Sequence, residues 1–400
     1  MLLMLIHPAS SLDAALRGLS VWWDVLFPSL FPFFVISEIM LGFGIVHLFG
    51  ALLDPLMRPL FNIPGSGGFV AAMGYVSGYP VGAKLTAKLR EQGMISRLEG
   101  ERLVAFTTSS DPIFLLGAVS VGFFHDASLG LVLALAHYGG GFIVGLLMKF
   151  HGRNDLPDSG LPAKAAVNPA GPAGQGSGRL RTALNAMAAA RRQDGRSFGE
   201  LLKNAVQSSL QLIIVVGGLV VFFNVLMELL ARAGIMSTLF SVTGWLLSLA
   251  GFPQGLSSAL VSGLFEVTLG ARSAGEAGAA LPLQFKAAAA ACILSWGGLS
   301  VHAQVASILN GTGLRYLPFM AARTVHALLS SGLVLLLWKP VTGSRLAAYF
   351  STLPAAAGLA SPESGLLSSL SLLCLLLAFM LLLSLLILLL GKLRRPPGHR

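Results

Sequence analysis

The stretch Met73-Gly-Tyr-Val-Ser-Gly-Tyr-Pro-Val-Gly-Ala-Lys84 interrupts an otherwise apolar part of the chain. Gly74, Gly78, Pro80 and Gly82 fall within nine residues, and glycine and proline at this density do not sustain a regular helix. Inside a membrane, the backbone groups freed by a break must be satisfied by partner groups, water or a ligand. We therefore predict a broken or re-entrant helix and a transport site here. The alternative is close helix packing through small residues.

A second interrupted segment, Ser262-Gly-Leu-Phe-Glu-Val-Thr-Leu-Gly-Ala-Arg272, repeats features of the first. Its Gly270-Ala271-Arg272 comes 188 residues after Gly82-Ala83-Lys84. Three further pairs keep the same order at offsets of 189 or 190 residues: Glu38 and Glu228, Pro64 and Pro253, and His137 and His326. Order and spacing predict two homologous membrane halves, residues 12–150 and 201–340. Such halves often run in opposite directions through the membrane, and we expect inversion here.

The composition around these segments indicates a membrane protein. Hydrophobic residues make up 54% of the chain and charged residues 11%, whereas an ordinary soluble domain carries about 25% charged residues. Leu366 to Leu390 is a run of 25 residues without a charge, and about 20 such residues span a bilayer core in a helix. We therefore predict an all-α, polytopic membrane protein in contact with the lipid bilayer, with a last transmembrane helix at residues 366–391.

The connecting segments carry the basic residues. Between Lys149 and Lys203 there are nine Lys or Arg against four Asp or Glu, and such a surplus is typical of cytoplasmic segments. We predict a disordered cytoplasmic linker at residues 151–200 with a short basic helix at 180–192. A polar spacer at 341–365 and a cytoplasmic C-terminus complete the chain. Nucleic acid is not an expected partner, because no aromatic residues interleave with these basic residues.

The predicted substrate- or ion-binding residues lie in the interrupted segments and in a second polar pair of segments, residues 107–112 and 295–304. Glu266 is the leading candidate, because a carboxylate at membrane depth is costly and usually faces a cavity or a partner. We predict that it acts as a substrate acceptor or as a proton or cation site. The whole predicted set is Gly78, Tyr79, Pro80, Ser109, Ser110, Asp111, Glu266, Thr268, Ser295, His302 and Gln304.

Structural roles compete with these functional ones. Asp111-Pro112 favours either an anion at a helix N-terminus or a capped helix at the membrane surface. His302 and Gln304 are equally suited to hydrogen bonding between helices. Lys84 and Arg272 are interpreted as reaching towards the headgroups. Four other residues are interpreted as structural: Glu38, Glu228, His137 and His326.

The sequence lacks the motifs of several enzyme classes. It has no Walker loop, no dinucleotide fingerprint and no Cys/His metal cluster. Cys292 and Cys374 lie in apolar stretches and imply neither a disulfide framework nor a metal site. We therefore expect no catalytic residues, no cofactor and no metal, and an ATP-driven pump or hydrolase within this chain is not favoured.

Several separated blocks resemble the YlbJ-type sporulation integral membrane proteins. They are Phe27-Pro-Ser-Leu-Phe-Pro-Phe33, Ser77-Gly-Tyr-Pro-Val-Gly-Ala-Lys84, Ser109-Ser-Asp-Pro112, Gly117-Ala-Val-Ser-Val-Gly-Phe-Phe-His125, Gly263-Leu-Phe-Glu-Val-Thr-Leu-Gly270 and Ser295-Trp-Gly-Gly-Leu-Ser-Val-His-Ala-Gln304. The resemblance covers roughly residues 10 to 340. The linker and the tail after Ala347 are less typical of the family, and the N-terminus looks shorter, so Met1 to Ile6 is expected to be the remainder of a membrane segment.

This resemblance implies membership of the gate-domain group, named for a segment shared by concentrative nucleoside transporters and the FeoB iron-transport region. It also implies expression in the mother cell of a spore-forming bacterium and a role in spore maturation, with cortex formation as the expected stage. It supplies no substrate.

The leading hypothesis is a transporter or gated pore for a small polar solute or ion, with its site between residues 74–84 and 263–272. The rival is a non-transporting membrane scaffold that recruits sporulation membrane proteins. Whether the protein forms a homo-oligomer stays open.

Overall fold

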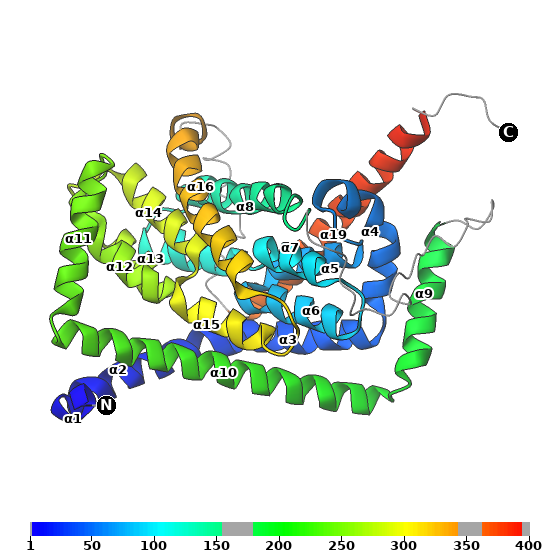
Figure 1. Ribbon diagram of the computed structural model, residues 1–400, viewed down its shortest axis with the longest axis horizontal. Coiled ribbons are helices and arrows are strands. Elements are labelled where there is room, and N and C mark those ends of the chain that lie inside the picture. The colour runs from blue at the N-terminus through cyan, green and yellow to red at the C-terminus, as the bar shows by residue number, and fades with distance from the viewer. Residues whose placement is uncertain (1, 154–178, 343–361, 394–400) are drawn as a thin grey trace.

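The computed structural model describes residues 2–153, 179–342 and 362–393, and every regular element in these ranges is a helix (Figure 1). The prediction of an all-α membrane protein is confirmed. Within the described ranges, four helical stretches are long and apolar enough to cross a membrane: Leu129–Met148, Phe198–Arg232, Leu283–Leu309 and Tyr316–Thr342. A bent pair, Phe34–Gly42 with Ile45–Phe61, would make a fifth crossing, and its two parts meet at 85°.

The first half begins with a nearly continuous rod. After the short α1 (Leu2–Ile6), this rod consists of α2 (Pro8–Ser20), the π-helix η1 (Val21–Leu26) and α3 (Phe27–Gly42). The half continues with α4 (Ile45–Phe61), α5 (Ser66–Ser77), α6 (Tyr79–Glu91), α7 (Arg97–Thr107), the π-helix η2 (Ile113–Phe123) and α8 (Leu129–Met148).

The second half presents the same order of elements. A single rod, α10 (Phe198–Arg232), takes the place of α2 to α3. It is followed by α11 (Ile235–Leu249), the 3₁₀ turn η4 (Gln254–Leu256), α12 (Ser257–Phe265), α13 (Val267–Gly275), α14 (Leu283–Trp296), α15 (Gly298–Leu309) and α16 (Tyr316–Thr342).

The turn after each rod has the same backbone conformation. Gly44 precedes α4 with φ 75°, and Gly234 precedes α11 with φ 74°. Glycine populates this left-handed region without the steric cost that other residues meet. The equivalence of Gly44 and Gly234 accords with the predicted repeat.

The two rods lie side by side and run antiparallel, with α2 and α3 along α10 (Figure 1). Arg17, early in the first rod, pairs with Glu228 near the end of α10 at 3.0 Å. At the other end, Gly42 lies against Leu201 near the start of α10. A two-fold axis in the membrane plane would produce this pairing. The opposite orientation of the halves in a membrane stays a prediction.

Two segments outside the halves also pack as helices. The predicted short basic helix at 180–192 corresponds to α9 (Arg179–Asp194), which packs against α4. The C-terminal helix α19 (Pro362–Leu393) packs against α4 and α5, and the Ser384 hydroxyl donates to the Leu52 carbonyl at 2.6 Å. The predictions for residues 154–178, 343–361 and 394–400 fall outside the described residues.

Four apolar segments of the described chain form broken helices. The breaks in residues 67–83 and 256–271 are the predicted ones. Residues 103–124 break at Thr108–Asp111, before the proline at which a break is expected. The candidate span Leu283–Leu309 is interrupted at Gly297, between α14 and α15.

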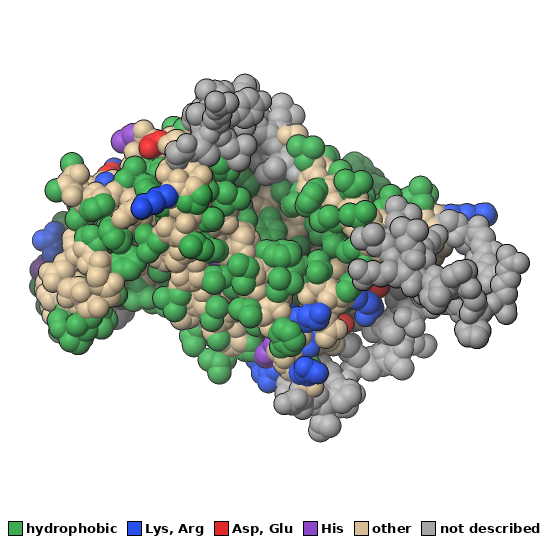
Figure 2. Space-filling model, turned by 90° about the horizontal axis from the view of Figure 1, so that it is seen from above, with side chains coloured by type: hydrophobic (Ala, Val, Ile, Leu, Met, Phe, Trp, Pro, Cys, Tyr) green, Lys and Arg blue, Asp and Glu red, His purple; other side chains and the backbone are tan. Residues whose placement is uncertain are grey.

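The surface suits a lipid environment. Hydrophobic side chains cover much of the face drawn in Figure 2, and charged side chains are few on it. Leu328 and Leu336 on α16 are 68% and 72% exposed. Extended apolar surface of this kind would be unfavourable in water, and a bilayer covers it.

Candidate functional site

The four helix breaks meet in pairs. In the first half, Gly78 separates α5 from α6, and the segment from Thr108 to Asp111 separates α7 from η2. A Cβ added to Gly78 would lie 3.1 Å from Asp111 Oδ2, so these two breaks touch. Gly78 also has φ 89°, a conformation that favours glycine.

The second half repeats this arrangement. Glu266 separates α12 from α13, and Gly297 separates α14 from α15, which begins at Gly298. A Cβ added to Gly298 would lie 3.0 Å from both Phe265 O and Val267 N, the residues on either side of Glu266. Each half therefore brings two interrupted helices together at their breaks.

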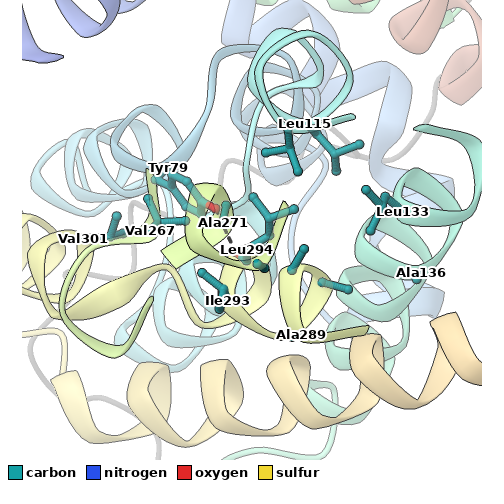
Figure 3. Packing of buried hydrophobic residues seen from close by; sticks show 14 of the residues in the cluster. Tyr79, Leu115, Leu133, Ala136, Val267, Ala271, Ala289, Ile293, Leu294 and Val301 are labelled. Carbon is teal, nitrogen blue, oxygen red and sulfur yellow. Dashed lines mark hydrogen bonds between the residues drawn. The ribbon is translucent and has the colours of Figure 1, made fainter. Parts of the chain in front are cut away.

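Two hydrogen bonds connect the breaks of one half to those of the other. The Tyr79 hydroxyl, next to the Gly78 break, donates to Leu294 O near the end of α14 at 2.7 Å (Figure 3). Arg323 Nη1, on α16, donates to Thr108 O at 2.6 Å. All four breaks thus belong to one central cluster.

His137 on α8 links the polar break of the first half to that of the second. Its Nε2 accepts from Ser109 Oγ at 2.9 Å and from Ser110 N at 3.2 Å. Because a backbone N–H only donates, Nε2 is the acceptor, and Nδ1–H donates to Ser295 Oγ at 2.8 Å. These partners hold His137 as a neutral imidazole.

His326 on α16 stacks on His137, with ring centroids 5.0 Å apart. Its Nδ1 accepts from Arg323 Nη1 at 3.0 Å, since a guanidinium only donates. Its Nε2–H therefore donates to the His137 carbonyl at 2.8 Å. Both histidines are buried and hydrogen-bonded, in accord with their predicted structural role, and both also lie within the cluster.

Arg323 is the functional candidate that sequence reasoning missed. Its side chain is fully buried, and it donates to Leu294 O at 3.3 Å and to Trp296 O at 3.4 Å, besides its bonds to Thr108 and His326. In the ranges that the structure describes, no carboxylate lies within 4.0 Å of this guanidinium. An arginine within the apolar segment 314–338 was the available signal, because charges at that depth usually mark function.

Glu266 is buried, and its carboxylate begins α13. Its Oε2 accepts from Leu269 N at 2.8 Å, an N-cap hydrogen bond that also places the negative charge at the positive end of the helix. Asp111 acts in the same way at η2, where its Oδ1 accepts from Phe114 N at 2.9 Å. Both acids are therefore directed at helix ends, not at Arg323.

Three buried hydroxyls near the cluster lack hydrogen-bond partners among the described residues. They are Ser77 Oγ, next to the Gly78 break, Ser110 Oγ in the Thr108–Asp111 break, and Ser330 Oγ on α16, which lies against Gly140. A buried hydroxyl without a partner is unfavourable, and a water or a polar ligand would satisfy it. These hydroxyls could therefore form hydrogen bonds to a water or a polar solute near the cluster.

The other predicted site residues lie at varying distances from this cluster. Pro80 and Thr268 occupy the first turns of α6 and α13, beside the breaks. His302 contacts Tyr316 Oη at 2.6 Å and Trp296 O at 3.2 Å, so it shares an acceptor with Arg323. Gln304 is buried on α15, which packs against α6, and no described contact ties it to the central residues.

The interpretation of Lys84 as reaching for the headgroups is wrong. Its side chain is buried and its Nζ lies 3.1 Å from Glu38 Oε1. The physical reason is that a partner carboxylate inside the fold compensates the charge, which would otherwise have to reach water.

Comparison with known proteins places this architecture in a family. The Gate family, described as nucleoside recognition, matches residues 24–124, which include the Gly78 and Asp111 breaks. The sporulation integral membrane protein YlbJ of Bacillus subtilis (strain 168) is 46% identical over 336 residues, covering 84% of this chain and 79% of the relative. The chain belongs to the YlbJ family of sporulation integral membrane proteins. It is a multi-pass membrane protein, and the YlbJ resemblance seen in the sequence is confirmed.

Proposed function

We propose that the protein is a transporter or gated pore that carries a small polar solute or ion through the bilayer. The observation that supports this is the meeting of four helix breaks around buried polar groups, joined across the two halves by Tyr79 and Arg323. Discontinuous helices facing each other between two repeats are the usual setting of a transport site. The Gate-family match of the first half accords with this proposal.

We further propose that the solute carries an anionic group. A buried guanidinium is costly without compensation, and among the described residues the hydrogen-bond partners of Arg323 are carbonyls and one imidazole. Its Nη2 donates a single hydrogen bond, to Leu294 O, which leaves one N–H for a ligand. Because Asp111 and Glu266 are engaged at helix ends, a carboxylate or phosphate on the solute would supply the missing negative charge.

The roles follow from these positions. Arg323 binds the anionic group, and Ser109, Ser110 and Ser295 border the path around His137. Glu266 is the coupling residue, because protonation would weaken its hold on α13 and change the break it occupies. We place this activity in the mother-cell-derived membrane during spore maturation, as the family's description as sporulation proteins suggests.

Transport by the purified full-length protein in liposomes tests the proposal. The vesicles would be offered nucleosides, amino acids, metal ions and dipicolinate separately, and uptake would be compared with protein-free vesicles. We expect saturable uptake of an anionic member of the panel. Absence of uptake for every solute, from protein that is folded by size exclusion and thermal melting, would favour the scaffold hypothesis.

A further inference from the structure

Two equivalent charged pairs are found in different states. In the first half, Lys84 and Glu38 form a buried ion pair at 3.1 Å, with side chains 7% and 14% exposed. Their counterparts in the second half are Arg272 and Glu228, which do not pair with each other among the described residues. Glu228 instead contacts Arg17 and Arg232, each at 3.0 Å, and Arg272 contacts Glu276 at 2.8 Å.

The separation of Arg272 from Glu228 leaves a cleft. It encloses about 620 Å³ between the first rod, α10, α11 and α13, and both charged residues line it. Its other walls include the apolar side chains of Leu16, Met227 and Met236. Clefts of roughly 300–1,000 Å³ are of the size that holds small molecules.

The helix α13 connects the wall of the cleft to the break at Glu266. Leu269 lines the cleft, and its backbone N–H donates to Glu266 at the start of α13. Arg272 follows one turn later on the same helix, so the distance from Glu266 to Arg272 along the axis is about 9 Å. A movement that closes the cleft would therefore act directly on the break at Glu266.

The two charged pairs lie at opposite ends of α10. Glu38 accepts from Ser208 at 3.3 Å, whereas Glu228 is itself part of α10, 20 residues further on. At 1.5 Å per residue this separation is about 30 Å, the thickness of a bilayer core. With α10 as a membrane span, one pair would lie near each face of the membrane.

We propose that the cleft is the open mouth of the transport path and that Glu228 and Arg272 close it by pairing as Glu38 and Lys84 do at the opposite face. This inference rests on the proposed function and adds a reciprocal gate to it. When the Lys84–Glu38 pair separates, the Arg272–Glu228 pair forms. The central site is then closed to the face that carries the cleft and open to the opposite face. Two packed arrangements of similar free energy, biased by a few contacts, are the usual basis of such a change.

Cysteine labelling of the full-length protein tests the gate without requiring transport. Cys292 and Cys374 would be replaced by alanine and Leu269→Cys introduced as a reporter in the cleft. A membrane-impermeant maleimide should label it readily when Lys84 and Glu38 are intact. Lys84→Met should slow labelling about fivefold, because the population shifts towards the state with the cleft closed.

Lys88→Met is the matched control, since Lys88 lies one turn further on α6 and is 4.0 Å from the exposed Glu91. It should leave the labelling rate unchanged. If Lys84→Met does not fold, Glu38→Gln should slow labelling in the same direction. Equal labelling rates in the parent, Lys84→Met and Glu38→Gln would overturn the gate. Resistance to labelling in all three proteins would also overturn it, because it would mean that lipid occupies the cleft permanently.

A disulfide gives a second, independent measurement. Glu228→Cys with Arg272→Cys can cross-link only when the two Cα atoms approach within about 7 Å. The cross-linked fraction should rise several-fold when Lys84→Met is added, and no rise would contradict the gate. If no solute in the liposome panel is taken up, the result contradicts the transport proposal alone. Neither labelling nor cross-linking depends on the solute.

Discussion

His326 donates a 2.8 Å hydrogen bond to the carbonyl of His137, the residue that precedes it by 189 positions and occupies the same place in the first half. The two imidazoles stack with centroids 5.0 Å apart, and each is hydrogen-bonded to the break regions around it. In the predicted repeat, residues related by the axis would meet in this way close to it. The histidine pair lies where the helix breaks converge.

Replacing His137 by Ala should destabilise the junction between the halves. Ser109, Ser110 and Ser295 would lose their common partner in a buried site, and buried polar groups left unsatisfied cost about 1–3 kcal/mol. Thermal unfolding of the purified protein in detergent would show a lower midpoint. A His137→Ala variant that melts with the parent protein would contradict the bridging role.

Glu266→Gln should abolish coupling while preserving the fold. The amide oxygen of glutamine can still accept from Leu269 N, so the helix cap survives, and the loss of charge at a helix N-terminus costs only about 0.3–1 kcal/mol. Uptake into liposomes should fall at least about tenfold, equivalent to about 1.4 kcal/mol.

Glu91→Gln is the control for that variant, because Glu91 lies at an exposed position at the end of α6. It should transport normally. Normal transport by Glu266→Gln, at unchanged abundance and placement in the membrane, would support a scaffold whose function instead depends on the linker or the C-terminal tail.

Gly78→Ala tests the break of the first half. Gly78 has φ 89°, and a methyl group there would approach Asp111 Oδ2. We therefore expect Gly78→Ala to lower the free energy of unfolding by about 1–3 kcal/mol. Gly139→Ala is the matched control, since Gly139 lies in α8 with open space around it. Alanine in a helix interior is favoured over glycine, so the control should melt at or above the parent temperature. Equal melting temperatures for Gly78→Ala and Gly139→Ala would contradict the steric role of Gly78.

The pH dependence of stability should report on Glu101, which lies on α7 outside the candidate spans. Its buried carboxylate accepts from Arg315 Nε at 2.8 Å and from His151 Nε2 at 2.7 Å. Burial raises the pKa of Glu101, but the hydrogen bonds from Arg315 and His151 outweigh it, so the pKa is lowered below the ordinary 4.5. A lowered pKa means that ionised Glu101 stabilises the fold above pH 4.5, and that this contribution disappears as the pH falls through the folded-state value.

Glu101→Gln should therefore lower the free energy of unfolding by about 1–3 kcal/mol at pH 7, and with it the melting temperature. The difference from the parent protein should shrink as the pH is lowered beneath 4.5. Glu91→Gln, at an exposed position on α6, should show no such difference. A gap between Glu101→Gln and the parent that stays constant from pH 7 to pH 4 would contradict the assignment.

The comparison of sequence and structure shows which features local patterns encode. Glycine and proline density at Gly78 predicts its break, because those residues act on their own backbone. The break at Gly297 is less clearly encoded, because two adjacent glycines in an apolar run are also compatible with close packing. Lys84 was misassigned because its partner, Glu38, comes from another helix, 46 residues earlier. Arg323 was missed for the same reason, since the carbonyls it binds belong to distant helix ends.

The most direct test of a transport site at the break junction is uptake by Arg323 variants. Parent protein, Arg323→Lys and Arg323→Gln would be reconstituted in liposomes at equal folded amounts, verified by size exclusion and melting, and offered the same solute panel. The proposal predicts that the parent takes up an anionic solute, that Arg323→Lys retains part of this uptake, and that Arg323→Gln loses it by at least about tenfold. Uptake of the anion at the parent rate by folded Arg323→Gln would contradict it.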